Sequence, residues 1–308
     1  MNPFKTEFPP IRTVGLIGLG AIGTLYAAKI VRRDPAGLRI IADPGRIARF
    51  RARPPTLNGV RLDLNYVTPA TPGPPADLIL VAVKSAGLPA VLPAIAPFLA
   101  AHTQILPLLN GITAQDTLTD AFGANRVLHG YVYCESAMRD GRDVTQDGTA
   151  RIVFGEAVNT PPSARVQAVA ACFQRLGIDH QIPDDMRAAQ WRKFILNVGI
   201  NQAQALLRAP CRELQQNPES MGLARRLMEE AAAVAGVLGI PGAAEIPPWA
   251  ESVIRSAAPE NKTSMLQDVD AGRPTEVEIF AGTVCRLGRL HGIPTPANDR
   301  ALLELRGA

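Results

Sequence analysis

Short apolar runs alternate with amphipathic stretches through roughly the first 180 residues. Runs typical of buried parallel strands occur at 13–18, 38–42, 77–83 and 104–109. Stretches with helical spacing of apolar positions occur at 21–33, 86–101, 113–121 and 162–176. Two further β segments are expected at 126–138 and 150–155, joined by a polar turn that contains Gly141 and Gly148, and an edge strand at 178–182. This alternation predicts a doubly wound α/β fold of the Rossmann type.

The strand pattern stops after Pro183, and only helical periodicity follows. Helices are predicted at 190–207, with an N-cap near Asp184 or Asp185, and at 218–238, 247–258, 275–290 and 296–305. A chain of 308 residues is long enough for two domains. The sequence therefore predicts a dinucleotide-binding domain over 1–184 and an all-α domain over 185–308.

A glycine-rich turn joins the first predicted strand to the first predicted helix. It reads Gly18, Leu19, Gly20, Ala21, Ile22 and Gly23, which is G-x-G-x-x-G spacing. In such a turn the first glycine permits a tight bend, the second lets the backbone approach a pyrophosphate, and the third lets the helix pack on the strand. The following helix offers its N-terminal N–H groups to the phosphates. This context, and not the glycines alone, predicts dinucleotide binding.

The end of the second predicted strand carries two opposing signals. Asp43 is close to the position where an acidic side chain accepts a hydrogen bond from the ribose 2′-OH of NAD. Arg46 and Arg49 follow it and could instead contact the 2′-phosphate of NADP, or form a solvated helix face. The residues themselves leave both cofactors open.

Two later strands end in polar residues. Lys84 follows the strand 77–83, and Asn110 follows the strand 104–109. Ligands bind outside the carboxyl ends of parallel strands, which makes both residues candidates for the site. For Asn110-Gly111 a hairpin turn is the alternative, but a helical pattern follows rather than a second strand.

The helix predicted at 190–207 is apolar over most of its surface. Lys193, Asn197 and Asn201 interrupt it at spacings of four residues, so they lie along one stripe. A buried amine and two buried carboxamides need partners, because an unpaired buried polar group costs roughly 1–3 kcal/mol. Either the protein or a ligand must supply these partners.

Further polar candidates lie at two junctions of the helical half. Asn261, Ser264 and Asp268 fall where a loop enters a helix, and capping is the structural alternative for this segment. Glu276 and Glu278 lie near a helix start, where a carboxylate also interacts favourably with the helix dipole. Spacing does not choose between these two glutamates.

Composition narrows the class of protein. Hydrophobic residues make up 47% and charged residues 19%, as in globular proteins, and the net charge of +4 is scattered, which argues against nucleic acid as a partner. No uninterrupted apolar run has membrane length, and the N-terminus lacks the apolar region of a secretory signal. The separated cysteines form no metal-like pair and are expected as buried thiols in a reducing cytoplasm: Cys134, Cys172, Cys211 and Cys285.

Taken together, these segments resemble one family over nearly the whole chain. GLGAIG, VAVKS, LPLLNG, WRKFILNVGINQAQAL, NKTSMLQDVDAGRPTEVE and HGIPTP are similar to the motifs of ketopantoate reductase (2-dehydropantoate 2-reductase), in order and at fitting intervals. The resemblance implies an NADPH-dependent enzyme that reduces the 2-oxo acid ketopantoate to pantoate on the route to pantothenate. It implies that Lys193 is the general acid and that Glu276 orients the substrate. It further implies substrate-binding roles for Asn197, Asn201, Asn261 and Ser264, and places Asn110 and Lys84 at the nicotinamide end, where Asn110 would also reach the substrate.

Three positions depart from the motifs of the resemblance. Asp43 stands where the family often has arginine, so NADP(H) is expected from the resemblance and NAD(H) from this residue. Gln202 stands where proline is common, and Ala281 where asparagine is usual. These departures keep a second reading open, the reduction of another small 2-oxo acid or of an opine-type imine. A nucleotide-sensing protein without turnover is the third alternative, and a homodimer is compatible with the apolar helical half.

Overall fold

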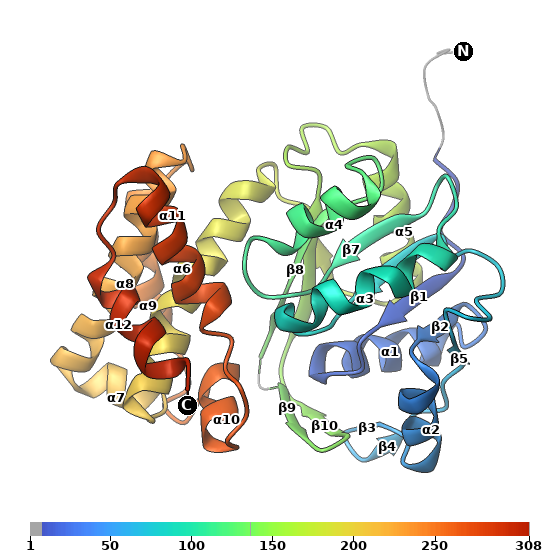
Figure 1. Ribbon diagram of the computed structural model, residues 1–308, viewed down its shortest axis with the longest axis horizontal. Helices are drawn as coiled ribbons and strands as arrows, with labels where there is room; N and C mark the ends of the chain where they lie inside the picture. The colour runs from blue at the N-terminus through green and yellow to red at the C-terminus, as the bar shows by residue number, and fades with distance from the viewer. Residues whose placement is uncertain (1–7, 136, 308) are drawn as a thin grey trace. The chain divides into compact units, whose positions relative to one another are not determined.

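The computed structural model describes residues 8–135 and 137–307. The chain divides into two compact units, Met1–Met186 and Arg187–Ala308 (Figure 1). The division lies two residues after the boundary expected from the sequence. We describe the first as the nucleotide unit and the second as the helical unit.

A five-stranded parallel sheet forms the centre of the nucleotide unit, in the order β5-β2-β1-β6-β7. Val14 at the start of β1 is in register with Leu38 of β2 on one side and Leu78 of β6 on the other. The order runs outward in both directions from β1, which confirms the doubly wound α/β prediction. The strands are β1 (Val14–Ile17), β2 (Leu38–Ile41), β5 (Tyr66–Val67), β6 (Leu78–Val81) and β7 (Gln104–Pro107).

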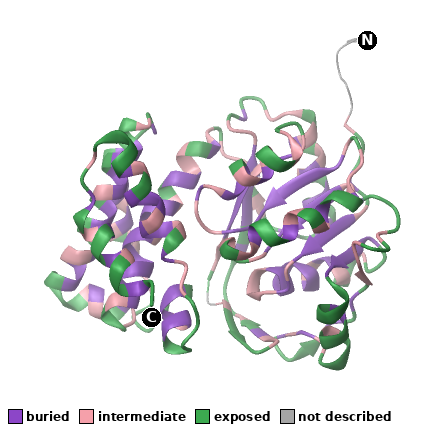
Figure 2. Ribbon diagram, in the orientation of Figure 1, coloured by how far each residue is buried: buried purple, intermediate pink, exposed green. Residues whose placement is uncertain are grey.

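Helices cover both faces of this sheet because successive strand residues point to opposite sides. In β6, Leu78 and Leu80 join the core beneath α1 (Ala21–Arg33) and α5 (Ala164–Leu176). Ile79 and Val81 join the core beneath α3 (Leu88–Ile95) and α4 (Ala114–Phe122). Figure 2 shows the central strands buried and the outer helix faces exposed.

The predicted helix at 86–101 is interrupted. It consists of a 3₁₀ turn at Ser85–Gly87, the short α3, and a second 3₁₀ turn at Ala96–Phe98. Pro93 lies inside α3 and Pro97 inside the second turn. Proline lacks an N–H donor and its ring clashes with the preceding turn, so the segment cannot form one regular helix.

The prediction for 126–155 is wrong in its middle part. The β segments are β8 (His129–Cys134) and β11 (Ala150–Gly155), but the expected turn between them contains the hairpin of β9 (Ala137–Asp140) and β10 (Asp143–Gln146). This hairpin forms a separate sheet, β4-β3-β10-β9, with β3 (Thr56–Leu57) and β4 (Val60–Arg61). The expected edge strand is reduced to β12 (His180–Gln181). Such short, mostly exposed strands have few apolar positions, and the hydrophobic pattern therefore gives no signal for them.

The helical unit is all-α, as predicted. Its helices are α6 (Met186–Leu207), α7 (Cys211–Gln216), α8 (Pro218–Val237), α9 (Ile246–Ser256), α10 (Ser264–Asp270), α11 (Thr283–His291) and α12 (Pro296–Leu305). The helix expected at 275–290 begins only at Glu278, with a π-helical turn, η4 (Glu278–Gly282), before α11. A Cβ at Gly199 of α6 would lie 2.4 Å from the Met228 side chain, so glycine permits the close approach of α8. None of the helices in the described part of the chain combines the length and the apolar composition needed to span a membrane.

Candidate functional site

In the glycine-rich turn after β1, each of the three glycines has the surroundings that its predicted role requires. Gly18 has φ +98°, and a Cβ there would lie 2.7 Å from the carbonyl of Ala82. A Cβ at Gly23 would lie 1.8 Å from the carbonyl oxygen of Gly18, so α1 can pack against the turn only without a side chain. A Cβ at Gly20 would have only the oxygen of Ala82 near it, at 3.9 Å. Gly20 therefore faces open space, as a backbone that receives a ligand must.

The N-terminus of α1 adds the electrostatic part of this site. The helix begins at Ala21, its N-cap is Gly20, and no acidic residue lies in its first turn. Its first N–H groups and the positive end of its dipole are therefore suited to an anion such as a pyrophosphate. Leu19 is buried and Ile22 is half-buried, so these two residues fix the turn while the glycines shape it.

The two polar strand ends lie at the same edge of the sheet as the glycine-rich turn. Strands β1, β6 and β7 end in register, at Ile17, Val81 and Pro107. The residues that follow these strands therefore leave the sheet at the same edge. Lys84 is exposed, and Asn110 is half-buried before a Gly111 with φ +89°. β6 ends at Val81 and β7 at Pro107, so Lys84 and Asn110 each lie three residues past a strand and not directly after it as predicted, and no hairpin follows Asn110.

Ser85, which follows Lys84 in the motif VAVKS, is a further candidate that was not among the predicted site residues. Its hydroxyl oxygen is buried and has no hydrogen-bond partner within the described residues. Because an unpaired buried hydroxyl is costly, a ligand at this strand end would find a ready hydrogen-bonding group. The glycine turn, the helix terminus and this hydroxyl together fit a dinucleotide.

Asp43 is the N-cap of α2 (Pro44–Ala52). Its carboxylate oxygen Oδ1 accepts the backbone N–H of Arg46 at 2.8 Å, and Oδ2 lies 3.2 Å from Nε of the Arg46 side chain. Both side chains are more than half exposed. The guanidinium of Arg46 is therefore paired with the residue that would repel a 2′-phosphate.

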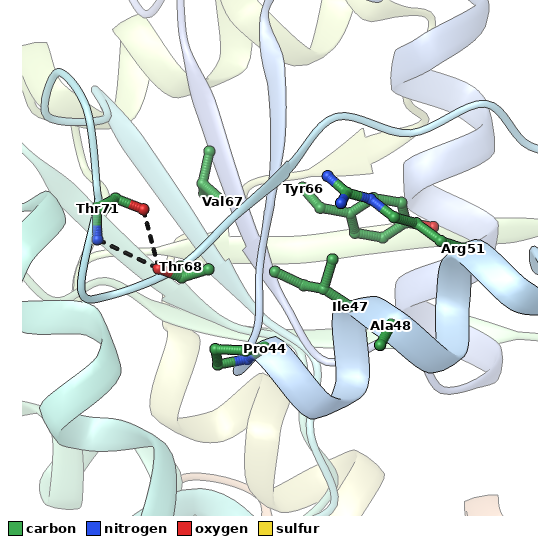
Figure 3. Close-up of a pocket in the computed structure, with 8 residues that line it drawn as sticks. All are labelled: Pro44, Ile47, Ala48, Arg51, Tyr66, Val67, Thr68 and Thr71. Carbon is green, nitrogen blue, oxygen red and sulfur yellow. Dashed lines mark hydrogen bonds between the residues drawn. The ribbon is translucent and has the colours of Figure 1, made fainter.

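A cavity of about 340 Å³ lies beside this cap (Figure 3). One wall is α2 and the other is β5 with the loop that follows it, where the hydroxyls of Thr68 and Thr71 are 3.1 Å apart. Its volume lies at the lower end of the range of small-molecule sites. The lining residues are Pro44, Ile47, Ala48, Arg51, Tyr66, Val67, Thr68 and Thr71.

In the helical unit, α6 carries the predicted polar stripe. Asn201 is only 5% exposed, while Lys193 and Asn197 are half-buried. Within residues 8–135 and 137–307, neither asparagine carboxamide has a hydrogen-bond partner. Neither amide is among the fully buried unpaired groups of the described residues, so both amides are accessible as well as unpaired, which favours a ligand-facing stripe over a structural one.

The two glutamates that spacing could not separate have different surroundings. Glu278 is exposed and forms an ion pair with Arg306 at 2.6 Å. Glu276 is half-buried and precedes the π-helical turn, whose Phe280 ring stacks on Phe194 of α6 with centroids 6.2 Å apart. Both glutamates lie in the segment that packs on Phe194, so this packing does not separate them. The exposure of Glu278 and its ion pair with Arg306 make the half-buried Glu276 the better candidate.

The loop before α10 holds Asn261 and Ser264. The carbonyl of Asn261 accepts the N–H of Cys211 at 3.1 Å, and its half-buried side chain remains at the loop surface. Ser264 is exposed at the first position of α10. Thr263 occupies the N-cap but makes no side-chain cap hydrogen bond, and its buried hydroxyl has no partner in the described structure.

Asp268 has a structural explanation. It is 4% exposed and accepts a hydrogen bond from Nε of Arg273 at 2.9 Å. The sequence could not separate this buried ion pair from the site residues nearby. It also did not single out Gln204, although a glutamine in an otherwise apolar stretch of helix was a usable signal.

Family models match both units. The model described as "Ketopantoate reductase PanE/ApbA" matches residues 14–159, and "Ketopantoate reductase PanE/ApbA C terminal" matches residues 185–307. A 2-dehydropantoate 2-reductase of Mesorhizobium japonicum is 28% identical over 95% of this chain and 96% of that protein. One from Halobacterium salinarum is 30% identical over 75% of each chain.

Solved structures agree with these matches. A 2-dehydropantoate 2-reductase from Geobacter metallireducens superposes with a TM-score of 0.80 at 25% identity, covering 95% of this chain and 98% of that one. A ketopantoate reductase from Ralstonia eutropha JMP134 superposes with a TM-score of 0.81 at 27% identity, covering 96% and 97%. These matches, together with the glycine-rich turn, define an oxidoreductase that uses a nicotinamide dinucleotide. The chain belongs to the ketopantoate reductase family.

Proposed function

We propose that this protein reduces ketopantoate to pantoate with a reduced nicotinamide dinucleotide, in pantothenate biosynthesis. The observation that carries the proposal is the α6 stripe, in which an amine lies about one and two turns from two carboxamides that have no partner within the described protein. Neutral amide donors suit a substrate that has a carboxylate and a hydroxyl. The names of the relatives at 28–30% identity support the same substrate.

The cofactor would be held by the glycine-rich turn, the N-terminus of α1 and Ser85, with Lys84 and Asn110 at the nicotinamide end. When bound, the reduced nicotinamide supplies a hydride. Asp43 would accept a hydrogen bond from the ribose 2′-OH, and its pairing with Arg46 supports NADH as the better cofactor. The cavity between α2 and β5 begins at Pro44, next to Asp43, and would receive part of the adenosine end.

Lys193 would act as the general acid. Its Nζ stabilises the negative charge that grows on the keto oxygen during reduction and then gives that oxygen a proton. Glu276 would accept a hydrogen bond from the substrate hydroxyl and orient it. Asn197, Asn201, Asn261 and Ser264 would bind the carboxylate and the hydroxyl groups.

The test is a reduction assay with purified protein. Ketopantoate, 2-oxoisovalerate and pyruvate are each offered with NADH and with NADPH, and loss of the reduced-nicotinamide absorbance is followed. A kcat/KM for ketopantoate at least tenfold above the other two supports the proposal. A higher value for another 2-oxo acid would assign that substrate instead, an alternative that the departures Gln202 and Ala281 leave open. Binding of nucleotide without turnover of any 2-oxo acid would favour a sensor.

A homodimer is the remaining part of the proposal. Leu290 of α11 is 71% exposed and Leu303 of α12 is 80% exposed. Large exposed apolar side chains on the helical unit support self-association through it. Light scattering on the purified chain checks this, and a monomer at micromolar concentration would contradict it.

A further inference from the structure

Two glutamines of α6 are completely buried. Gln202 and Gln204 each have 0% exposure, and their side chains leave the helix in different directions because they are two residues apart. Buried glutamines are kept only where their hydrogen bonds are satisfied. Each of these amides bonds to a different segment of the helical unit, and each of those segments carries a proposed site residue.

Gln202 fixes the segment that carries Glu276. Its Oε1 accepts the backbone N–H of Ala281 in the π-helical turn at 3.0 Å. Backbone hydrogen bonds connect Ala281 to the preceding residues of the segment, because the N–H of the next residue, Gly282, bonds to the carbonyl of Val277 at 3.1 Å. The N–H of Ile279 bonds in turn to the carbonyl of Glu276 at 3.1 Å.

Further hydrogen bonds orient the amide of Gln202 itself. Its Nε2 donates to the carbonyl of Val198 at 2.8 Å and to Oδ1 of Asn298 at 3.1 Å. Asn298 donates to Oε2 of Glu230 at 2.8 Å, and Glu230 accepts the backbone N–H groups of Ala297 and Asn298 at the start of α12. A chain of satisfied bonds from three helices therefore sets the orientation of the Gln202 amide.

Gln204 fixes the loop that carries Asn261. Its Oε1 accepts the backbone N–H of Thr263 at 2.8 Å, and its Nε2 donates to the carbonyl of Asn261 at 3.1 Å. The same Nε2 lies 3.1 Å from the sulfur of Cys211, whose N–H also bonds to the Asn261 carbonyl. Because one side chain makes two hydrogen bonds to the loop, it fixes both the position and the orientation of the loop.

We infer that Gln202 and Gln204 are positioning residues for the proposed reaction: Gln202 sets Glu276, and Gln204 sets Asn261, against the Lys193–Asn197–Asn201 stripe on the same helix. The inference rests on the proposed function. The stripe and both anchors belong to one rigid element, so a single helix fixes the amine, the carboxamides and the two segments that complete the set. Gln202 and Ala281 are also the two departures from the family motifs in this unit, and the structure joins them by a direct hydrogen bond.

The first experiment tests the anchors without reference to activity. Gln202→Met and Gln204→Met keep the unbranched length and remove the polar atoms, and each variant is the matched control for the other. Amide hydrogen exchange should rise at least tenfold at residues 277–282 in the first variant and at 261–264 in the second. An equal rise in both segments in both variants would overturn the separate anchoring. If a methionine variant does not fold, exchange of the wild type is measured instead: the backbone N–H groups of Ala281 and Thr263, which donate to the two glutamines, should be protected at least tenfold, and rapid exchange of both would overturn the anchoring.

The second experiment tests positioning by double-mutant cycles on kcat/KM. Each methionine variant should lower kcat/KM roughly 10- to 100-fold, as misplacement of a site group does. Gln202→Met should be non-additive with Glu276→Gln by at least fivefold and additive with Asn261→Ala, and Gln204→Met should show the reverse. Additivity in all four cycles, despite raised exchange, would make both glutamines purely structural and overturn the inference.

The two proposals fail in different ways. If the wild type reduces no 2-oxo acid, the proposed function fails, and the kinetic role of both glutamines fails with it. The exchange experiment then still decides whether each glutamine anchors its own segment. If the wild type is active and the cycles are additive, only the positioning roles are lost.

Discussion

Asp43 caps α2 through the backbone N–H of Arg46 and at the same time pairs with the side chain of that arginine. One residue shortly after β2 therefore caps α2 and pairs with the nearest candidate for a 2′-phosphate contact. The sequence shows the acid and the base as competing signals. The structure shows that they are partners.

The first prediction concerns cofactor preference. Asp43→Asn keeps an oxygen that can cap α2 but removes the charge that repels a phosphate and pairs with Arg46. We expect the ratio of kcat/KM for NADPH to that for NADH to rise about tenfold or more, where tenfold corresponds to about 1.4 kcal/mol. Arg46→Ala should produce no such rise. A wild type that already prefers NADPH strongly would contradict the role given to Asp43.

The second prediction concerns the general acid. Lys193→Ala should lower kcat by about 10²–10⁴-fold, the usual contribution of a positioned proton donor, because nothing then gives a proton to the keto oxygen. The dissociation constant of the nucleotide, measured by fluorescence titration, should stay within about twofold. Lys262→Ala is the control, since this lysine of the same unit is half-exposed and paired with Asp270 at 2.8 Å. Equal turnover in the Lys193 and Lys262 variants would remove Lys193 from the mechanism.

The third prediction separates two glycines of one turn. Gly20→Ala adds a Cβ in open space and should leave the melting temperature nearly unchanged while weakening nucleotide binding at least tenfold. Gly23→Ala places a Cβ 1.8 Å from the oxygen of Gly18 and should cost roughly 1–3 kcal/mol of folding free energy, because α1 must shift. Thermal unfolding and nucleotide titration of both variants check this. Normal binding by Gly20→Ala would show that no phosphate approaches there.

The fourth prediction concerns acid stability. Burial acts to raise the pKa of Glu156, but hydrogen bonds from Arg165 at 2.6 Å and Ser163 at 2.8 Å outweigh it and lower that pKa. A carboxylate with a lowered pKa in the folded state contributes stability above its unfolded pKa and loses it as the pH falls through the folded value.

Glu156→Gln should therefore be less stable than wild type by roughly 1–2 kcal/mol near pH 7, after allowance for partial exposure. The difference should begin to shrink as the pH falls through the unfolded-state pKa of about 4.3 and should be lost as the pH falls further, through the lower folded-state pKa of Glu156. Urea unfolding at several pH values measures it. Glu278→Gln, which removes an exposed ion pair, is the control and should show no measurable loss at either pH. A difference that stays constant down to pH 2 would contradict the assignment.

Local sequence was sufficient for four of the five strands of the central sheet and for most long helices, while the two-residue β5 was not predicted. The helix at 21–33 and the β segment at 150–155 have the expected bounds, and the helix at 296–305 does as well. These segments combine strong periodicity with clear start signals, such as Gly20 before α1 and Pro296 at the first position of α12. The hairpin of β9 and β10 was missed because its strands are stabilised by pairing with β3, more than 70 residues earlier in the chain. Pairing with a strand so far away in the sequence does not change the local pattern of apolar and polar residues, so the pattern cannot predict it.

By itself, the sequence determined the glycine-rich turn, the polar stripe on the helix at 190–207 and the family, because each depends on residue types at fixed local spacing. Only the tertiary structure distinguishes the two glutamates, since Glu278 is exposed and pairs with Arg306 while Glu276 is half-buried. It also decided that Gln202 and Gln204 hold two distant segments. Hydrogen bonds between residues some 60 to 80 positions apart follow from the packing of helices, and spacing along the chain does not encode them.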